Sequence, residues 1–492
     1  MAHTEITIGI DIGTTGVKGA ALDVDRGIIA HAHRPTALSS PKPGWAEAST
    51  VQWFDNAVAV INELVRSPAL SGRTVAAIAT TGMVPAVVAV NSQAHALRPA
   101  ILQNDTRATD EVEQTAKALR ASGVLHRTGS PVTQQSVGPT AVWLQRNEPN
   151  VWADTAALVG SYDWVLAALG APLHVEKNWA IESGLYELDG QPFTSAVSIA
   201  HLEEQLVPVL PPGTVVGTLS PRAAAATGLP TDTALVVGGA DHVLSAYGAG
   251  LADEGDWLVK LGGAGDILAV ATTPVVDDRF YLDAHPIDGL WLPNGCMATS
   301  GSLVRWVQET LNEDNLQLLD RHAAQRNPAE LLCLPYFLGE KSPLNDPDLR
   351  GVFAGMHLGH DRYDLYRSAL EGIAFGFRHN AAALRDRGLR LETATITNGG
   401  STSPLWKQIH ADILGAPLRT VVHHSGAAFG AAVAAAIGVQ ALDGWNAVSR
   451  YVRMGETIDP NPAAMAHYDD AYPLWRELAK ATAPTMRALA RR

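Results

Sequence analysis

The sequence predicts an α/β protein built from two large, similar domains, and three observations support this prediction. The chain has 492 residues, which is too long for one typical domain and long enough for two. Residues 6–23 and 257–272 each combine two β-rich runs with a tight glycine-rich turn, and they lie about half a chain apart. Helical and strand patterns alternate after each hairpin, as in α/β folds. Two hairpins that each open one half of the chain suggest two similar domains facing a shared nucleotide cleft.

Composition excludes several classes of protein. Hydrophobic residues make up 47% of the chain and charged residues 17%, which is typical of a compact protein. The formal charge of −14 argues against non-specific binding to nucleic acid or to an anionic membrane. Two cysteines give neither a disulfide framework nor a zinc pattern. The first residues lack a signal-peptide pattern, and the longest apolar run, residues 426–438, is too short to span a bilayer. We therefore expect a cytoplasmic protein with no nucleic-acid or membrane partner.

The elements of the first half follow from local patterns. Ser49 or Thr50 can cap a helix, because apolar residues then recur at helical spacing as far as Val65. Runs of β-branched and small apolar residues predict the strands. The predicted elements are strands at 6–11, 17–23, 28–33, 75–82 and 86–90, a helix from residue 50, a loop at 207–214, and a buried strand at 234–242. We place a domain boundary just after the last of these, which gives domains 1–243 and 244–492.

The turn of the first hairpin has the chemistry of a phosphate loop. Gly13 and Gly16 allow the backbone to bend and to approach a ligand closely. Thr14, Thr15 and the turn N–H groups can donate hydrogen bonds to phosphate oxygens. Asp11 adds a carboxylate, which suggests Mg²⁺ or a metal-bound water beside the phosphates. An ordinary glycine-rich hairpin is the alternative for this stretch alone, since neither a Walker P-loop nor a Rossmann fingerprint occurs.

Six segments carry a resemblance to a known family. They are Ile-Asp-Ile-Gly-Thr-Thr (10–15), Gly-Gly-Ala-Asp-His (238–242), Leu-Gly-Gly-Ala-Gly (261–265), Leu-Pro-Tyr-Phe-Leu-Gly-Glu-Lys-Ser-Pro-Leu-Asn-Asp-Pro (334–347), Phe-Ala-Gly-Met-His (353–357) with Asp-Leu-Tyr-Arg-Ser-Ala-Leu-Glu (364–371), and Asn-Gly-Gly-Ser-Thr-Ser-Pro-Leu-Trp-Lys-Gln-Ile-His-Ala-Asp (398–412). Each is weak alone, but their order is specific. Over nearly its whole length the chain resembles the FGGY carbohydrate kinases, which include xylulokinase, gluconokinase and glycerol kinase.

The resemblance implies a fold and an activity. The fold would be two actin-like (ribonuclease H-like) domains flanking a nucleotide and sugar cleft. The activity would be ATP-dependent phosphorylation of a sugar hydroxyl, with a ketopentose such as xylulose as the default substrate. Asp241 would be the general base that takes the hydroxyl proton, as phosphoryl transfer requires. From the residues alone, the alternative is a structural Asp241 that caps the following helix.

The same resemblance implies the residues that hold the cofactors ATP and Mg²⁺. Asp11 would organise Mg²⁺, directly or through water. Thr14, Thr15, Gly262 and Gly263 would hold phosphate oxygens. Gly399 and Gly400 match the nucleotide-side glycines of the family, although a plain turn is the alternative for this pair. Ser403 would lie near the adenosine.

The sugar side departs from the family pattern. Xylulokinase-like members carry Gln-Met-His-Gly where this chain has Gly82-Met83-Val84-Pro85, so Val84 stands at the position of an expected histidine. Gln103 stands where relatives often have tryptophan. We expect a pocket richer in amides, which suits a neutral polyhydroxylated substrate. Its predicted lining is Met83, Gln103, Asp105, Gln135, Asp241 and His242.

Other functions remain open. A kinase for a polyol or a sugar acid, resembling those for glycerol, erythritol or gluconate, is the alternative within the class. A catalytically silent sugar sensor of the same fold is a second class, which usually adds a DNA-binding segment or loses the catalytic acid. An actin-like filament protein is a third. The retained Asp11 and Asp241 favour the kinase, and a homodimer is left open.

Overall fold

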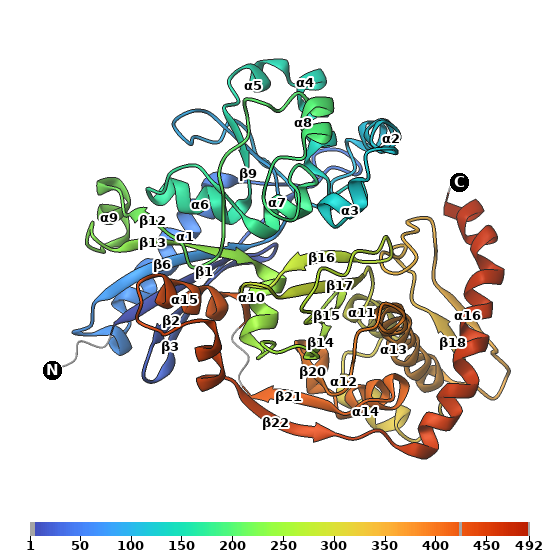
Figure 1. Ribbon diagram of the computed structural model, residues 1–492. Helices are drawn as coiled ribbons and strands as arrows, with labels where there is room; N and C mark the ends of the chain where they lie inside the picture. The colour runs from blue at the N-terminus through green and yellow to red at the C-terminus, as the bar shows by residue number, and fades with distance from the viewer. Residues whose placement is uncertain (1–4, 423–425, 491–492) are drawn as a thin grey trace. The chain divides into compact units, whose positions relative to one another are not determined.

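The chain folds into two compact units, each described here by itself. The computed structural model describes residues 5–422 and 426–490 (Figure 1). Within these, the first unit comprises residues 5–250, 282–290 and 426–451, and the second comprises 251–281, 291–422 and 452–490. A late segment of the chain thus belongs to the first unit. The division into functional domains after residue 243 remains a prediction.

The first unit is built on a mixed sheet with the order β12-β13-β6-β1-β2-β3. Its strands are β1 (Ile6–Ile12), β2 (Gly16–Asp23), β3 (Gly27–Pro35), β6 (Val75–Gly82), β12 (Val215–Thr218) and β13 (Ala234–Ala240). The first three strands are antiparallel, β1 runs parallel to β6 and β6 parallel to β13, and β12 is an antiparallel edge. The predicted strands at 6–11, 17–23, 28–33 and 75–82 are confirmed. The strand predicted at 234–242 is present but ends at Ala240, because Asp241 and His242 begin helix α10.

Helix α1 (Thr50–Arg66) begins where the sequence indicates. The Ser49 hydroxyl accepts a hydrogen bond from the Gln52 backbone N–H and caps the helix. The buried face of the helix carries Trp53, Ala57 and Leu64 at helical spacing. This face packs on the strands, as the periodicity predicts.

Helix α15 (Gly426–Gly438) lies on β1 in the first unit (Figure 1). A Cβ atom at Gly9 of β1 would lie 1.9 Å from the Ala428 carbonyl oxygen, so the contact requires glycine. Alanines 427, 431, 434 and 435 of α15 join Ala77, Ala79 and Val236 of the sheet in one buried cluster. Small side chains on both sides therefore bring the helix and the sheet backbones close together.

The remaining elements of the first unit are shorter. The strands are β4 (Leu38–Ser39), β5 (Glu47–Ala48), β7 (Val88–Val90), β8 (Ala100–Ile101), β9 (Ala157–Val159), β10 (Val175–Glu176) and β11 (Val209–Leu210). The helices are η1 (Pro68–Leu70), α2 (Thr109–Ala118), α3 (Val124–Thr128), α4 (Val137–Asn147), α5 (Pro149–Ala153), α6 (Ser161–Leu169), α7 (Lys177–Ser183), α8 (Thr194–Ala200), α9 (Pro221–Thr227), α10 (Asp241–Gly248) and η3 (Trp445–Arg450). The predicted loop at 207–214 was wrong in one detail, because its residues 209 and 210 pair with β10 and form β11.

The second unit repeats the same sheet pattern. Its order includes β17-β15-β14-β20-β21-β22, with antiparallel pairs β17–β15 and β15–β14, parallel pairs β14–β20 and β20–β21, and β22 as an antiparallel edge. The strands are β14 (Trp257–Leu261), β15 (Gly265–Ala269), β17 (Trp291–Met297), β18 (Leu332–Leu334), β19 (Val352–Ala354), β20 (Ala394–Thr397), β21 (Leu418–Val422) and β22 (Arg453–Ile458); β16 (Tyr281–Ala284) begins at the change of unit. The predicted similarity of the two halves is thus present in the strand pairing.

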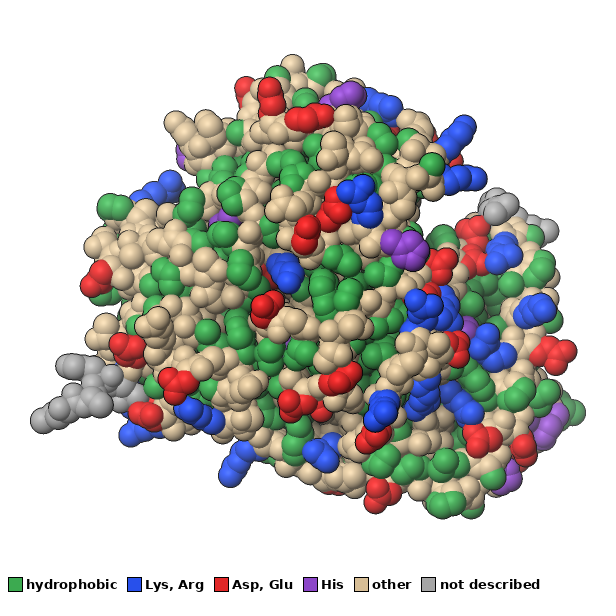
Figure 2. Space-filling model, in the orientation of Figure 1, with side chains coloured by type: hydrophobic (Ala, Val, Ile, Leu, Met, Phe, Trp, Pro, Cys, Tyr) green, Lys and Arg blue, Asp and Glu red, His purple; other side chains and the backbone are tan. Residues whose placement is uncertain are grey.

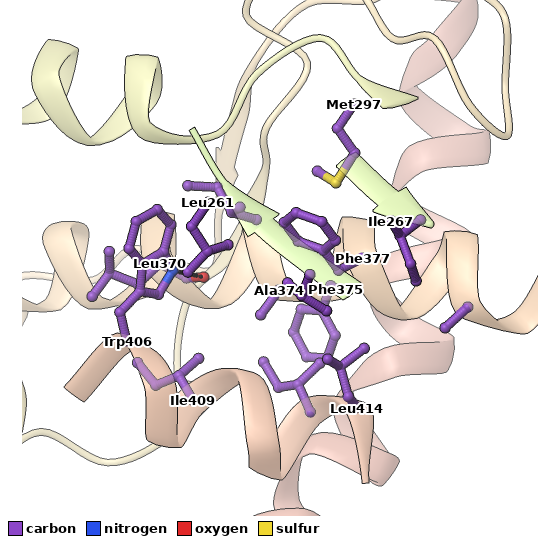
Figure 3. Packing of buried hydrophobic residues seen from close by; sticks show 14 of the residues in the cluster. Leu261, Ile267, Met297, Leu370, Ala374, Phe375, Phe377, Trp406, Ile409 and Leu414 are labelled. Atoms are coloured by element: carbon purple, nitrogen blue, oxygen red, sulfur yellow. Dashed lines mark hydrogen bonds between the residues drawn. The ribbon is translucent and has the colours of Figure 1, made fainter. Parts of the chain in front are cut away.

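Helices cover the sheet of the second unit. They are α11 (Gly301–Leu311), α12 (Leu316–Ala323), α13 (Arg362–Asp386), η2 (Gly399–Thr402), α14 (Pro404–Leu414) and α16 (Pro462–Ala490). Figure 3 shows how strand residues Leu261, Ile267 and Met297 lie with Phe375 and Phe377 of α13 and with Ile409 and Leu414 of α14. This buried cluster gives the second unit a core of its own.

The surface carries both signs of charge. Lys and Arg side chains on the face shown in Figure 2 have Asp and Glu side chains among them. No helix within residues 5–422 and 426–490 is both long and apolar enough to cross a membrane.

Candidate active site

Asp11 lies near the end of β1, the first strand of the first hairpin. This carboxylate is 9% exposed and stands next to the last residue of β1. The Gly13 N–H donates to the Gly16 carbonyl oxygen at 3.1 Å and closes the turn, while Thr14 and Thr15 are exposed. A Cβ atom at Gly16 would lie 2.5 Å from the Arg34 carbonyl oxygen, so a side chain cannot be added there. The turn presents its hydroxyls outward beside a carboxylate.

Asp241 is the first residue of α10 and directly follows β13. Its side chain is 35% exposed, which leaves it accessible to a substrate. The N-cap position belongs to Ala240, whose side chain makes no capping hydrogen bond. Asp241 is therefore the first residue inside α10 and is not its N-cap residue. An acidic residue in a first helical turn is favoured by the helix dipole.

A buried cluster of charged groups adjoins Asp241 in the first unit. Nδ1 of His242 lies 3.5 Å from Oδ1 of Asp241, and its Nε2 lies 2.9 Å from Oδ2 of Asp283. Oε1 of Glu182, on α7, lies 3.9 Å from the same Nε2. The side chains of Glu182 and Asp283 are 7% and 0% exposed. Both nitrogens of His242 therefore face carboxylates.

These groups shift one another's protonation. Burial alone would lower the pKa of His242, but Asp283, Asp241 and Glu182 raise it well above 6.5. Burial, followed by the negative charge of Asp283, raises the pKa of Glu182 well above its ordinary value. Both shifts run in the direction of a neutral Glu182 carboxyl group and a charged His242 ring, which lies between Asp283 and Asp241.

The cluster could also be considered as a cation site. One ligand atom from each of Glu182, His242 and Asp283 lies within 4.8 Å of the others. The 2.9 Å distance between Nε2 of His242 and Oδ2 of Asp283 also fits a hydrogen bond. We interpret the three residues as a cluster of charged groups that is centred on this contact.

The predicted sugar-side residues lie in several environments of the first unit. Met83 follows β6 and is 2% exposed. Gln103 and Gln135 are half-buried, and among the residues described the side-chain carbonyl oxygen of each has no hydrogen-bond partner. Each oxygen can accept a hydrogen bond from a hydroxyl group.

Asp105 is occupied by protein contacts. Its carboxylate accepts hydrogen bonds from the Ala46 N–H at 2.6 Å and from the Arg107 guanidinium at 2.7 and 2.8 Å. The guanidinium carbon of Arg107 lies 3.7 Å from the centre of the Trp45 ring. The observed contacts of Asp105 thus fix the loop that contains Gln103.

One cavity in the second unit brings five of the predicted nucleotide residues together. It has a volume of about 970 Å³ and includes Gly262, Gly263, Gly399, Gly400 and Ser403 in its lining. Sequence reasoning missed the other polar groups that line it. They are Arg305, Gln308, Gln317, Asp320, Arg321, Tyr366 and Thr402.

Hydrogen bonds and close packing shape this cavity. The Ser403 hydroxyl donates to Oδ2 of Asp320 at 2.7 Å and accepts from the Trp406 N–H, so it caps α14. The Tyr366 hydroxyl donates to Oδ1 of Asp320 at 2.8 Å. A Cβ atom at Gly400 would lie 2.2 Å from the Trp406 ring, whereas none of the described atoms lies within 4 Å of a Cβ at Gly399. The two predicted glycines therefore differ: Gly400 is required by packing, and Gly399 faces open space.

Comparison with known proteins identifies the family. Models of the N-terminal and C-terminal domains of the FGGY family of carbohydrate kinases match residues 6–248 and 263–439. The crystal structure of xylulose kinase from Rhodospirillum rubrum is 40% identical, with a TM-score of 0.90, and the match covers 98% of this chain and 99% of that one.

Two curated relatives extend this comparison. Xylulose kinase of Staphylococcus epidermidis is 27% identical over 97% of both chains. Gluconokinase of Bacillus subtilis is 23% identical over 97% of this chain and 96% of its own. The predicted family, fold class and kinase activity are confirmed: the chain belongs to the FGGY family of carbohydrate kinases, has two domains of the actin-like fold, and is an ATP-dependent carbohydrate kinase.

Proposed function

We propose that the protein phosphorylates a ketopentose, with D-xylulose as the first candidate. The observation that carries this proposal is the 40% identity to a xylulose kinase over nearly the whole of both chains. Further support comes from the curated xylulose kinases that match over 97% of this chain. The sugar is small, neutral and polyhydroxylated, and the side-chain oxygens of Gln103 and Gln135, which have no hydrogen-bond partner among the described residues, suit its hydroxyl groups.

The proposed reaction assigns Asp241 as general base. The sugar oxygen attacks the γ-phosphorus of ATP, and the new O–P bond forms as the bond to the β,γ-bridging oxygen breaks and ADP leaves. The hydroxyl proton passes to the Asp241 carboxylate, which is accessible at the start of α10. We propose Met83, Gln103, Asp105, Gln135 and His242 as the residues that form or support the sugar pocket.

The donor side of the proposal uses the two glycine-rich hairpins. Thr14 and Thr15 are exposed at one turn and can donate to phosphate oxygens. Gly262, Gly263, Gly399, Gly400 and Ser403 share one cavity large enough for part of a nucleotide. The cavity is lined by both apolar and polar residues, which suits a purine and its ribose.

Asp11 suits Mg²⁺ by the chemistry of its donor atoms. A carboxylate that is nearly buried at a strand end, beside exposed hydroxyls and backbone amides, offers the hard oxygen that this cation prefers. We propose that Asp11 holds Mg²⁺ directly or through a water. The bound cation would neutralise charge on the phosphates.

A sugar acid or a polyol is the second candidate substrate. The relative that favours it is the gluconokinase that matches over 97% of this chain. Val84 at the position of an expected histidine also alters the sugar side relative to xylulokinase-like members. The silent-sensor alternative is disfavoured because Asp11 and Asp241 are both present. A homodimer and a cytoplasmic location remain predictions, and light scattering tests the first.

The first experiment is a coupled assay of ADP release. Purified protein with Mg-ATP is given D-xylulose, other ketopentoses, glycerol, erythritol and gluconate, with a no-sugar control. We expect saturable turnover with D-xylulose, and Asp241→Asn should lower kcat by about 10²-fold or more. Preferential turnover of gluconate or a polyol would replace the proposed substrate. An Asp241→Asn variant with wild-type kcat would remove Asp241 as the base.

A further inference from the structure

The residues next to Asp241 form a chain of alternating charge. Asp241 and His242 occupy the first turn of α10, Asp283 lies on β16, and Glu182 lies on α7, all in the first unit. The contacts run from Asp241 to His242 at 3.5 Å and from His242 to Asp283 at 2.9 Å. Oε1 of Glu182 lies 3.9 Å from the same Nε2 of His242, so Glu182 and Asp283 both adjoin this nitrogen. No step of the proposed reaction yet uses Glu182 or Asp283.

A second contact fixes the strand segment that carries Asp283. The Ala284 N–H donates to Oδ1 of Asn178 at 2.7 Å, and Nδ2 of Asn178 donates to the Ala284 carbonyl oxygen at 3.1 Å. Asn178 and Glu182 are four residues apart on α7, so they lie on one face of that helix. The helix therefore holds the backbone beside Asp283 and also places Glu182 next to His242.

The exposure of these groups separates their roles. The Asp241 side chain is 35% exposed, His242 is 13% exposed, and Asp283 is fully buried. Only Asp241 is open to a substrate, and the groups behind it become progressively less accessible. A residue that binds sugar through its ring nitrogens would need at least one of them free, but both nitrogens of His242 face carboxylates.

We propose that His242, Asp283 and Glu182 are positioning residues that hold the carboxylate of Asp241 in its orientation for proton transfer. Asp283, supported by Glu182 and Asn178, fixes the imidazole so that its Nδ1 edge faces Asp241. The positive charge of the ring then keeps the Asp241 carboxylate ionised and directed. This inference rests on the proposed function of Asp241 and refines the predicted role of His242, which acts on the sugar through Asp241.

The test compares Asp283→Asn, Glu182→Gln and His242→Asn with the wild-type protein. Turnover is measured with Mg-ATP and D-xylulose, or with the panel compound that the wild type turns over fastest, from pH 5 to 9. We expect kcat to fall about tenfold in Asp283→Asn and His242→Asn, with KM for the sugar within about twofold. The acid limb of the profile should move up by roughly one pH unit, because Asp241 loses a neighbouring cation.

Matched controls separate positioning from general damage. Glu113→Gln on α2 and His126→Asn on α3 change exposed residues of the same unit and should leave kcat and the pH profile unchanged. Near-ultraviolet circular dichroism checks that each variant folds. Glu182→Gln keeps the shape of the side chain and leaves the 2.9 Å contact between His242 and Asp283 in place, so it should retain more activity than Asp283→Asn.

Three results would overturn the inference. An unchanged pH profile with unchanged kcat in folded Asp283→Asn and His242→Asn removes the positioning role. A tenfold rise in sugar KM with unchanged kcat and acid limb makes His242 a direct sugar contact. If the wild-type protein binds about one equivalent of zinc tightly and Asp283→Asn does not, the cluster is a metal site. Asp241→Asn, measured in parallel, distinguishes failure of the positioning role from failure of the proposed base. If Asp241→Asn keeps the wild-type kcat, Asp241 is not the general base.

Discussion

Thr7 of β1 donates a hydrogen bond from Oγ1 to the carbonyl oxygen of Ala432 on α15 at 2.7 Å, and both residues are fully buried. The two residues are 425 positions apart in the sequence. The same interface places Gly9 against the backbone of Ala428. One face of the sheet in the first unit thus depends on close packing between its first strand and a helix from late in the chain.

Gly9→Ala should strongly destabilise the protein. The added methyl group would lie 1.9 Å from the Ala428 carbonyl oxygen and 2.4 Å from the Ala432 nitrogen, and backbone atoms of a packed helix cannot move aside easily. We expect the free energy of unfolding in urea to fall by about 3 kcal/mol. Gly138→Ala on α4 is the control, because its nearest contacts would be an ordinary 3.6 Å. Equal stability of the two variants would contradict the packing argument.

Gly400→Ala and Gly399→Ala should separate packing from ligand binding in the nucleotide cavity. At Gly400 the methyl group would collide with the Trp406 ring and with Leu261, so both the melting temperature and the affinity for ATP should fall. Gly399→Ala meets no described atom within 4 Å and should keep the wild-type melting temperature. Calorimetric titration with ATP measures affinity. If Gly399→Ala raises the Kd for ATP without lowering the melting temperature, Gly399 lies in contact with the bound nucleotide. A thermally unaffected Gly400→Ala would refute the steric argument.

Asp105→Asn should leave a buried cation without its main partner. The Arg107 side chain is 1% exposed and retains only Glu47, at 2.8 Å, as a carboxylate partner. Removal of one member of a buried ion pair typically costs about 3–5 kcal/mol. Glu63→Gln breaks the exposed pair with Arg34 and should change stability by less than about 1 kcal/mol. Urea unfolding of both variants checks the contrast, and similar losses would argue against the structural importance of Asp105.

Glu176→Gln should flatten the dependence of stability on pH. Burial raises the pKa of Glu176 to about 7, although hydrogen bonds from Asn178 and Tyr162 oppose the shift. The folded state therefore holds this proton more tightly than the unfolded state, whose pKa is near 4.5. The stabilising contribution is complete below pH 4.5 and is lost as the pH rises through 7.

The measurement is the free energy of unfolding at pH 5 and pH 8. With a pKa of about 7 in the folded state and 4.5 in the unfolded state, the wild-type protein should lose about 2.5 kcal/mol more than Glu176→Gln between these two pH values. Glu203→Gln changes an exposed carboxylate and should follow the wild type. A variant whose stability falls as steeply as that of the wild type would mean that Glu176 is ionised in the folded state.

Local patterns predicted the framework of the fold well. The strands around Gly13 and Gly262 were recognisable because a glycine-rich turn between two β-rich runs is a short-range feature. The glycines of two distant segments, Gly262 and Gly399, were assigned to one ligand through the family resemblance, and the structure brings them to one cavity. Their roles in binding remain predictions.

The rest depended on contacts that no local pattern contains. Glu182 and Asp283 approach His242 from two separate elements, and each is an isolated acid in an otherwise ordinary segment. Asp320 lies on an amphipathic helix, where an acid normally faces solvent, and only its hydrogen bonds with Tyr366 and Ser403 mark it as part of the cavity. The sequence pattern also could not predict that α15 packs in the first unit. Its alanines predict a closely packed helix, but they do not indicate which sheet the helix covers.

That return has a consequence for biosynthesis. When a ribosome has completed residue 250, every strand of the sheet that contains β1 exists, but the helix that covers Gly9 does not. At about 5–20 residues per second, the nascent chain waits on the order of ten seconds or more before α15 is made. During this interval the small apolar side chains of β6 and β13 that α15 will cover are exposed to solvent or to a chaperone. The N-terminal half therefore cannot reach its final form until most of the C-terminal half has been translated.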